Sequence, residues 1–178
     1  MYISSFVGLD LAAKEKNPTG FCVINNQKII VKTLFSTEEI IDNIKEINPF
    51  VIAIDAPLVK GDIIIRKADR LMKKYGAMPP IMPSMKLLAQ RGTNIAKRLE
   101  IQGYDVIEVF PTGTAKILGF YEKKYKKSIK RLNMQNVFNN KHEYDAYLCS
   151  LTAKYYYYGE TKKVGDGQGT IVIPLETL

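Results

Sequence analysis

The stretch that decides the fold is Phe6–Ala13, which reads Phe-Val-Gly-Leu-Asp-Leu-Ala-Ala. Apolar residues and a glycine lead to a single acid, Asp10, and small residues follow it. This pattern predicts a buried strand that ends at the acid. Because a lone buried carboxylate is costly, Asp10 needs a cation, a metal ion or a hydrogen-bonded network as its partner.

A second stretch, Phe50–Pro57, repeats the same design and carries Asp55 at the end of its apolar run. Continuous apolar runs of this kind are typical of strands that are buried on both faces of a covered sheet. If the two strands lie side by side, Asp10 and Asp55 emerge at the same edge of the sheet. The two carboxylates would then repel each other unless they are protonated or bridged by a divalent cation.

Three further strands are predicted along the chain. Thr19–Ile24 and Lys28–Leu34 follow the first strand closely and predict an antiparallel meander. A helix from Ser36 or Thr37 to Ile47 precedes the Asp55 strand, so a right-handed crossover to a parallel position is expected. Asp105–Phe110 is the next strand, and it carries the single acid Glu108.

The remaining segments are read mainly as helices. We predict helices over Arg66–Tyr75, over Ser84–Gln102 with a break at Gly92, over Ala115–Leu118 and over Lys141–Tyr158. The glycines of 165–169 predict a turn that leads into a last strand over Thr170–Pro174. No linker divides the chain, so one domain over 1–178 is expected, with a helical insertion at about 60–103.

Composition narrows the classes of partner. The formal net charge of +8 favours polyanionic partners, nucleic acid above all. No apolar run approaches the roughly 20 residues that a membrane-spanning helix requires, and no signal peptide is evident, so a cytoplasmic protein without a membrane partner is expected.

Cys22 and Cys149 lie in apolar contexts and are expected to be buried thiols. With His142 as the sole histidine, any metal would be held by oxygen ligands.

Asp145 is the third acid of interest. On a helix its row continues through Cys149, Thr152 and Ala153, whose small side chains would let this face approach a sheet closely. Each acid taken alone is well explained as a cap, a salt bridge or a solvated carboxylate. Three acids that end or face apolar elements favour a cluster instead. Such a cluster suits two Mg²⁺ or Mn²⁺ ions, which support phosphodiester hydrolysis.

The motifs that carry these acids look like those of the ribonuclease H-like superfamily. They are Val7–Ala12, Ala53–Leu58 and Tyr144–Ala153. More narrowly, the chain resembles the uncharacterised family called domain of unknown function 429, which is described as a predicted nuclease. This narrower resemblance rests on three further pieces: Arg66–Asp69, Glu108–Pro111 and Gly169–Pro174.

The resemblance implies an α/β fold, with a ribonuclease H-like five-stranded mixed sheet of three antiparallel and then parallel strands, and helices on both faces. It implies that Asp10, Asp55 and Asp145 bind the metal ions and that Glu108 joins the catalytic set. The glutamates of the first helix do not match the helix glutamate of true ribonuclease H, which favours the resolvase-like branch. Since resolvase-like relatives often act as dimers, a homodimer is one expectation.

Basic residues supply the candidate contacts to a substrate. Arg66 and Asp69 lie one helical turn apart and either pair with each other or serve substrate phosphate and metal ligands. The basic run at 122–131 is either a solvated face or, together with Tyr121 and Tyr125, a site that holds a nucleic-acid strand. The candidate substrate-binding residues are Lys14, Arg66, Arg91, Lys123, Lys124 and Lys127. For His142, a capping or surface role and a general acid–base role are both open.

Three functions remain as hypotheses. The first is a nuclease that hydrolyses phosphodiester bonds in DNA or RNA with Mg²⁺ or Mn²⁺. The second is a non-catalytic nucleic-acid-binding protein with the same fold. The third is a phosphate- or nucleotide-handling protein of the actin-like type, which begins with a similar Gly-x-Asp strand but normally needs two related domains. The net charge predicts nucleic-acid binding equally under the first two hypotheses, so metal occupancy and turnover separate them.

Overall fold

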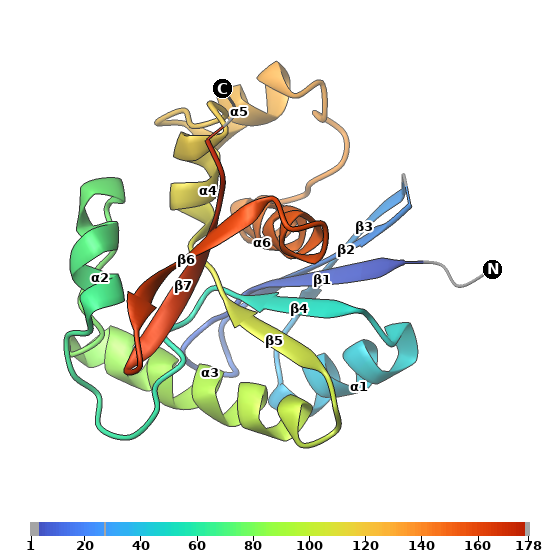
Figure 1. Cartoon of the computed structure of the whole chain (residues 1–178). Coiled ribbons are helices and arrows are strands. Elements are labelled where there is room, and N and C mark those ends of the chain that lie inside the picture. The colour runs from blue at the N-terminus through green and yellow to red at the C-terminus, as the bar shows by residue number, and fades with distance from the viewer. Residues whose placement is uncertain (1–3, 27, 177–178) are drawn as a thin grey trace.

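The computed structural model describes residues 4–26 and 28–176, and its centre is a five-stranded sheet of order β3-β2-β1-β4-β5 (Figure 1). β1, β2 and β3 form an antiparallel meander, whereas β4 runs parallel to β1 and β5 parallel to β4. This mixed sheet confirms the predicted fold class. The strands are β1 (Ser5–Asp10), β2 (Thr19–Asn25), β3 (Lys28–Leu34), β4 (Val51–Ile54) and β5 (Asp105–Glu108).

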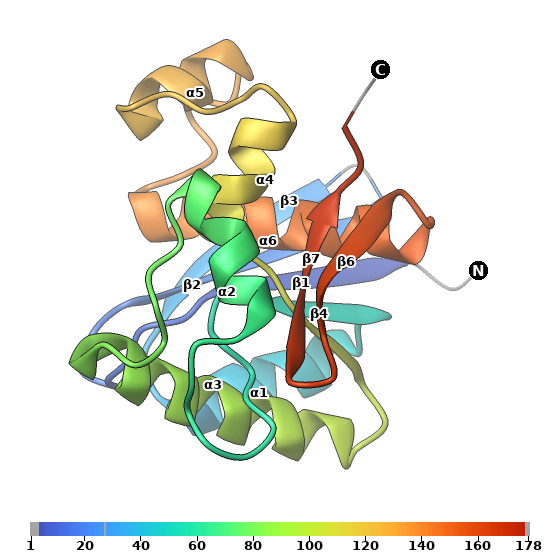
Figure 2. The same cartoon turned by 60° about the vertical axis from the view of Figure 1, so that its left-hand side comes forward.

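Helices cover both faces of the sheet (Figures 1 and 2). α1 begins where predicted, because the Ser36 hydroxyl accepts a hydrogen bond from the Glu39 amide at 3.1 Å. The helices are α1 (Thr37–Ile47), α2 (Lys67–Met72), the short 3₁₀ helix η1 (Lys73–Tyr75), α3 (Pro83–Glu100), α4 (Pro111–Ile117), α5 (Tyr125–Arg131) and α6 (Lys141–Tyr157). Among the described residues, no helix is both long enough and apolar enough to cross a membrane.

The pleat of the sheet divides the core into two layers. Val7 and Leu9 of β1, with Ile52 and Ile54 of β4, pack against α1 and α3. Phe6 and Ala53 lie on the other side of the same strands and pack against α6. Because side chains alternate along a strand, Asp10 and Asp55, which directly follow Leu9 and Ile54, turn toward the α6 layer.

Two glycines bring α6 very close to the sheet. A Cβ built on Gly8 would lie 2.2 Å from the carbonyl oxygen of Ala146, and one on Gly20 would lie 1.9 Å from that of His142. Cys149 and Ala153 on the facing side of α6 are fully buried. The predicted close approach of the small-residue row is therefore confirmed, and it needs glycine on the strands as well as small residues on the helix.

Several segments differ from the prediction. α5 lies in the basic segment for which no helix was predicted, and α4 begins at Pro111 and not at Ala115. The polar segment Thr161–Asp166 forms a strand, β6, which pairs with β7 (Gly169–Pro174) in a separate hairpin (Figure 2). The glycine-rich segment was expected to be only a turn, because β6 lacks the apolar alternation that marks a strand. α3 is not broken at Gly92, since this glycine serves packing: a Cβ there would lie 2.6 Å from the Cβ of Ala56.

Candidate functional site

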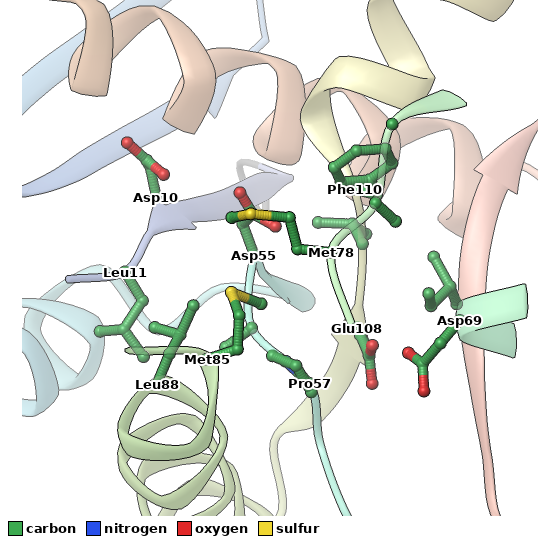
Figure 3. A pocket seen from close by; sticks show the side chains of 15 residues that line it. Asp10, Leu11, Asp55, Pro57, Asp69, Met78, Met85, Leu88, Glu108 and Phe110 are labelled. Atoms are coloured by element: carbon green, nitrogen blue, oxygen red, sulfur yellow. The ribbon is translucent and has the colours of Figure 1, made fainter. Parts of the chain in front are cut away.

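Asp10 and Asp55 lie side by side at the carboxyl ends of β1 and β4. Leu9 pairs with Ile54 in the parallel register, and the Asp55 amide donates to the Leu9 carbonyl at 2.9 Å. Each aspartate is the next residue after this pair, so both side chains fall on the α6 side of the sheet. They line a cavity of 210 Å³ that opens at this edge (Figure 3).

Asp145 approaches the same place from α6, where Gly8 and Gly20 let the helix lie close to β1 and β2. Burial raises the pKa of Asp55 well above its usual value, and the nearby carboxylates of Asp10 and Asp145 raise it further. Within the described part of the chain, the Asp55 carboxylate makes no hydrogen bond or ion pair. The three aspartates thus form an acidic group with excess negative charge.

Two basic side chains from the first turn of α6 meet this group. Lys141 forms an ion pair with Asp145, and His142 Nδ1 lies 2.7 Å from an oxygen of Asp10. Burial raises the pKa of Asp145 to about 6, against the opposing effect of Lys141. The hydrogen bond to Asp10 raises the pKa of His142, which favours its protonated form.

Glu108 belongs to a different arrangement. Its two oxygens accept hydrogen bonds from Arg66 Nη1 and Nη2 at 2.7 and 2.6 Å, and one of them also accepts from the Leu58 amide at 2.7 Å. Arg66 in turn donates to Asp69 through Nε and Nη2, at 3.1 and 2.7 Å. All three side chains are buried. Burial raises the pKa of Glu108 to about 7, although Arg66 and the Leu58 amide lower it.

The register explains why Glu108 is separate. Glu108 pairs directly with Ile54, whereas Asp10 and Asp55 each lie one residue beyond the Leu9–Ile54 pair. Glu108 therefore falls on the opposite side of the pleat, and Figure 3 shows it facing Asp69 across the cavity from the two aspartates. The structure brings Asp10, Asp55 and Asp145 together and places Glu108 in the Arg66 arrangement.

The candidate substrate-binding residues fall into two groups. Arg66 is only 1% exposed and pairs with Asp69, so of its two predicted roles the structure shows pairing and not an exposed contact for phosphate. Arg91 is also largely buried and donates to the carbonyls of Ala12 and Phe35, both at 2.7 Å, which ties α3 to the strand ends. Lys14, Lys123, Lys124 and Lys127 are exposed.

Lys123 differs in its position from the other three candidate lysines. It lines a hollow of 140 Å³ together with Tyr121, Tyr125, Lys141 and Asp145. This hollow connects the basic segment at 122–131 with the acidic group, as a strand-binding surface would require.

The acidic group fits a hard divalent cation by its chemistry, since carboxylate oxygens are the ligands that Mg²⁺ and Mn²⁺ prefer. In the described residues, however, no three His, Cys, Asp or Glu side chains are arranged to hold one ion. Lys141 and His142 occupy two of the carboxylates, and both side chains are about half exposed (58% and 47%). Metal binding would therefore require these two side chains to give way.

Several of these contacts leave no signal in the sequence. His142 lies on α6 one turn before Asp145, but its contact with Asp10 depends on how closely the helix approaches β1. Likewise, Arg66 and Glu108 are far apart in sequence, and their contact depends on the parallel pairing of β4 with β5 and on the path of the chain from β4 to α2. The signal that would have separated Glu108 from the aspartates is its position in the pleat. Glu108 is level with the Leu9–Ile54 pair, whereas each aspartate lies one residue beyond it.

Comparison with known proteins supports the fold. No protein-family model matches the chain, and no curated protein matches it either. Among solved structures, RuvC of T. thermophilus in complex with a Holliday junction substrate is similar, with a TM-score of 0.58 and 11% identity. The match covers 96% of this chain and 99% of that one. The chain has a ribonuclease H-like fold, while the narrower resemblance to domain of unknown function 429 stays a prediction.

Proposed function

We propose that this protein is a metal-dependent nuclease that hydrolyses phosphodiester bonds in DNA or RNA. The observation that carries the proposal is the convergence of Asp10, Asp55 and Asp145 from β1, β4 and α6. These carboxylates are close enough to raise the pKa of Asp55, and the described residues leave the Asp55 carboxylate without a hydrogen bond. A buried acidic group of this kind favours a bound cation.

In this proposal Asp10, Asp55 and Asp145 hold Mg²⁺ or Mn²⁺. When bound, such ions supply an activated water and stabilise the leaving oxygen of the phosphodiester. His142 contacts Asp10 and is placed to orient that carboxylate. Glu108 is assigned an indirect part in the catalytic set: with Arg66 it fixes the Leu58 amide, and so the path of the chain as it leaves β4.

Nucleic acid is the proposed substrate for electrostatic reasons. The net charge of +8 attracts a polyanion, and Lys123 lines a hollow that also contains Asp145 and three tyrosines. Lys14, Lys124 and Lys127 are exposed and available for further phosphate contacts. The likeness to RuvC, which was solved with a Holliday junction, makes branched DNA a substrate to include in any test.

One observation favours a second candidate, a non-catalytic nucleic-acid-binding protein. Lys141 and His142 already neutralise part of the charge on Asp145 and Asp10 without any metal ion. A protein that had lost its metal ions could keep its fold through these pairs. The two candidates predict similar nucleic-acid affinity and differ in turnover.

A cleavage assay separates them. Labelled single-stranded, duplex and four-way-junction substrates of DNA and RNA are incubated with the wild type, D10N or D42N, each with Mg²⁺ or Mn²⁺. Asp42 is an exposed residue of α1 and serves as a control for the loss of one acid. We expect the wild type and D42N to cleave at least one substrate, and D10N to be slower by about 10²–10³-fold, the scale of lost transition-state charge stabilisation.

Two results would contradict the proposal. If D10N cleaves as fast as the wild type, the acidic group is not the reactive centre. If the wild type binds the substrates but cleaves none with either metal, the non-catalytic candidate is correct.

A further inference from the structure

The cavity beside Asp10 and Asp55 extends beyond the carboxylates into an apolar hollow. Asp10 and Asp55 form one end of this cavity, and Asp69 and Glu108 line another part of it (Figure 3). The walls between them are mostly apolar, and they include Leu11, Met78, Met85, Leu88, Phe110 and Ile171. Carboxylate-held metal ions require oxygen ligands, so the apolar part is not explained by metal binding.

The electrostatics of the cavity restrict what can enter it. Four acidic side chains line it, and one guanidinium, that of Arg66, is shared by two of them, so without metal ions a phosphate group would be repelled. The apolar walls disfavour a hydrated cation. What remains is a neutral group with apolar faces and with N–H donors at its edge, because carboxylate oxygens accept hydrogen bonds. A nucleobase has this combination, and carboxylates recognise the amino groups of bases in the same way.

The size of the cavity agrees with a single ring system. Its 210 Å³ is below the roughly 300–1,000 Å³ of pockets that hold drug-sized ligands. Methionine suits a flat aromatic guest, because its sulfur is polarizable and its side chain adapts to the ring. Phe110 adds an aromatic wall, and bases are commonly held against aromatic and apolar side chains.

The segment 76–82, between η1 and α3, supplies part of this wall. Met78 lines the cavity although it is 53% exposed. Met82 in the same segment is 41% exposed and does not line the cavity. A base seated in the cavity would remove apolar surface of Met78 from water, which is favourable.

We propose that this cavity binds one unpaired nucleobase of the substrate, next to the phosphodiester that faces Asp10 and Asp55. The inference rests on the proposed nuclease function and sharpens its substrate class. The preferred substrate is a strand with an unpaired nucleotide at the cleavage position, and a fully paired duplex binds less well because its bases stay stacked.

The test compares M78A with M82A, which remove similar exposed side chains from the same segment. Affinity for short single strands is measured by fluorescence anisotropy without divalent cations, so that no cleavage occurs. A second set of strands carries one abasic site, stepped along the sequence. We expect M78A to weaken binding of the intact strand about two- to tenfold, on the scale of methionine–aromatic contacts, and M82A to leave it unchanged.

The abasic strands make the test specific. At one position, removal of the base should weaken binding by the wild type, and M78A should then have no further effect, because the two changes remove the same contact. Equal effects of M78A and M82A would overturn the proposal. So would an M78A effect on the abasic strands and on duplex that is as large as the effect on the intact single strand. Since binding is measured apart from cleavage, this failure is distinct from a failure of the proposed nuclease activity.

Discussion

Two acidic groups lie at the same end of the central sheet and have opposite surroundings. Asp10 and Asp55 face α6, which carries Asp145, and within the described residues the ion pairs of this group are made by the partly exposed Lys141 and His142. Glu108 and Asp69 lie near the other end of the cavity and share the buried guanidinium of Arg66 through four hydrogen bonds. The same residue types therefore give a closed ion-pair arrangement on one side and an open, only partly paired acidic group on the other.

The comparison shows that position at the strand end is not enough to assign a role. Asp10 and Glu108 end their strands and Asp55 directly follows β4, and these three strands are neighbours in the sheet. What separates them is one step of pleat register, together with a buried arginine on one side only. We expect the closed arrangement to contribute stability and the open group to bind the metal ions.

The largest expected effect is on the closed arrangement. R66M leaves the carboxylates of Glu108 and Asp69 buried without their cation, and we expect the free energy of unfolding to fall by about 3–5 kcal/mol. R98M is the matched control, because Arg98 makes a comparable two-bond contact with Glu38 at the surface. Exposed pairs contribute about 0–1 kcal/mol. Urea unfolding, monitored by circular dichroism, measures the free energy of unfolding of both variants. Equal losses of stability would contradict the distinction between buried and exposed pairs.

A smaller effect is expected on the open group, and it has the opposite sign. The folded protein raises the pKa of Asp55 and of Asp145, the latter to about 6, so folding favours their protonated forms. Stability from these groups is therefore present at low pH and is lost as the pH rises through the folded pKa values. Without divalent cations, D55N should be more stable than the wild type near pH 7–8.

The pH dependence tests the cause of that difference. Between about pH 7 and pH 4 the advantage of D55N should shrink, with a slope of at most about 1.4 kcal/mol per pH unit for the single site. Unfolding free energies of both proteins across this range give the slope directly. If D55N is less stable than the wild type at pH 8, the charge of the Asp55 carboxylate is already compensated by other groups in the fold.

Much of the fold follows from local sequence signals. The apolar runs that end in Asp10 and Asp55, and the capped helix that begins after Ser36, are visible in the chain and are found in the structure. β6 could not be predicted, because its polar residues gain their strand conformation from pairing with β7. Propensity and periodicity carry no information about such a partner.

The candidate site was predictable to a similar degree. The acids were visible because each interrupts an apolar element, and the small residues of α6 indicated a close approach. The partners of those acids were not visible. Arg66 meets Glu108 across 42 positions, and His142 meets Asp10 across 132, so both contacts depend on the register of the sheet and on the approach of α6.

The most direct test of the account is a calorimetric titration with Mn²⁺, compared among the wild type, D10N and E108Q. Each variant neutralises one acid of the same sheet edge. We expect the wild type and E108Q to bind Mn²⁺ with the same stoichiometry and D10N to lose binding, because Asp10 belongs to the open group and Glu108 to the closed one.

The titration is repeated with a single-stranded oligonucleotide whose phosphates can complete the ligand set. Equal binding by D10N and the wild type, or loss of binding in folded E108Q alone, would contradict the assignment of the two acidic groups. Absence of binding in all three proteins, with and without the oligonucleotide, would contradict the metal-dependent mechanism itself.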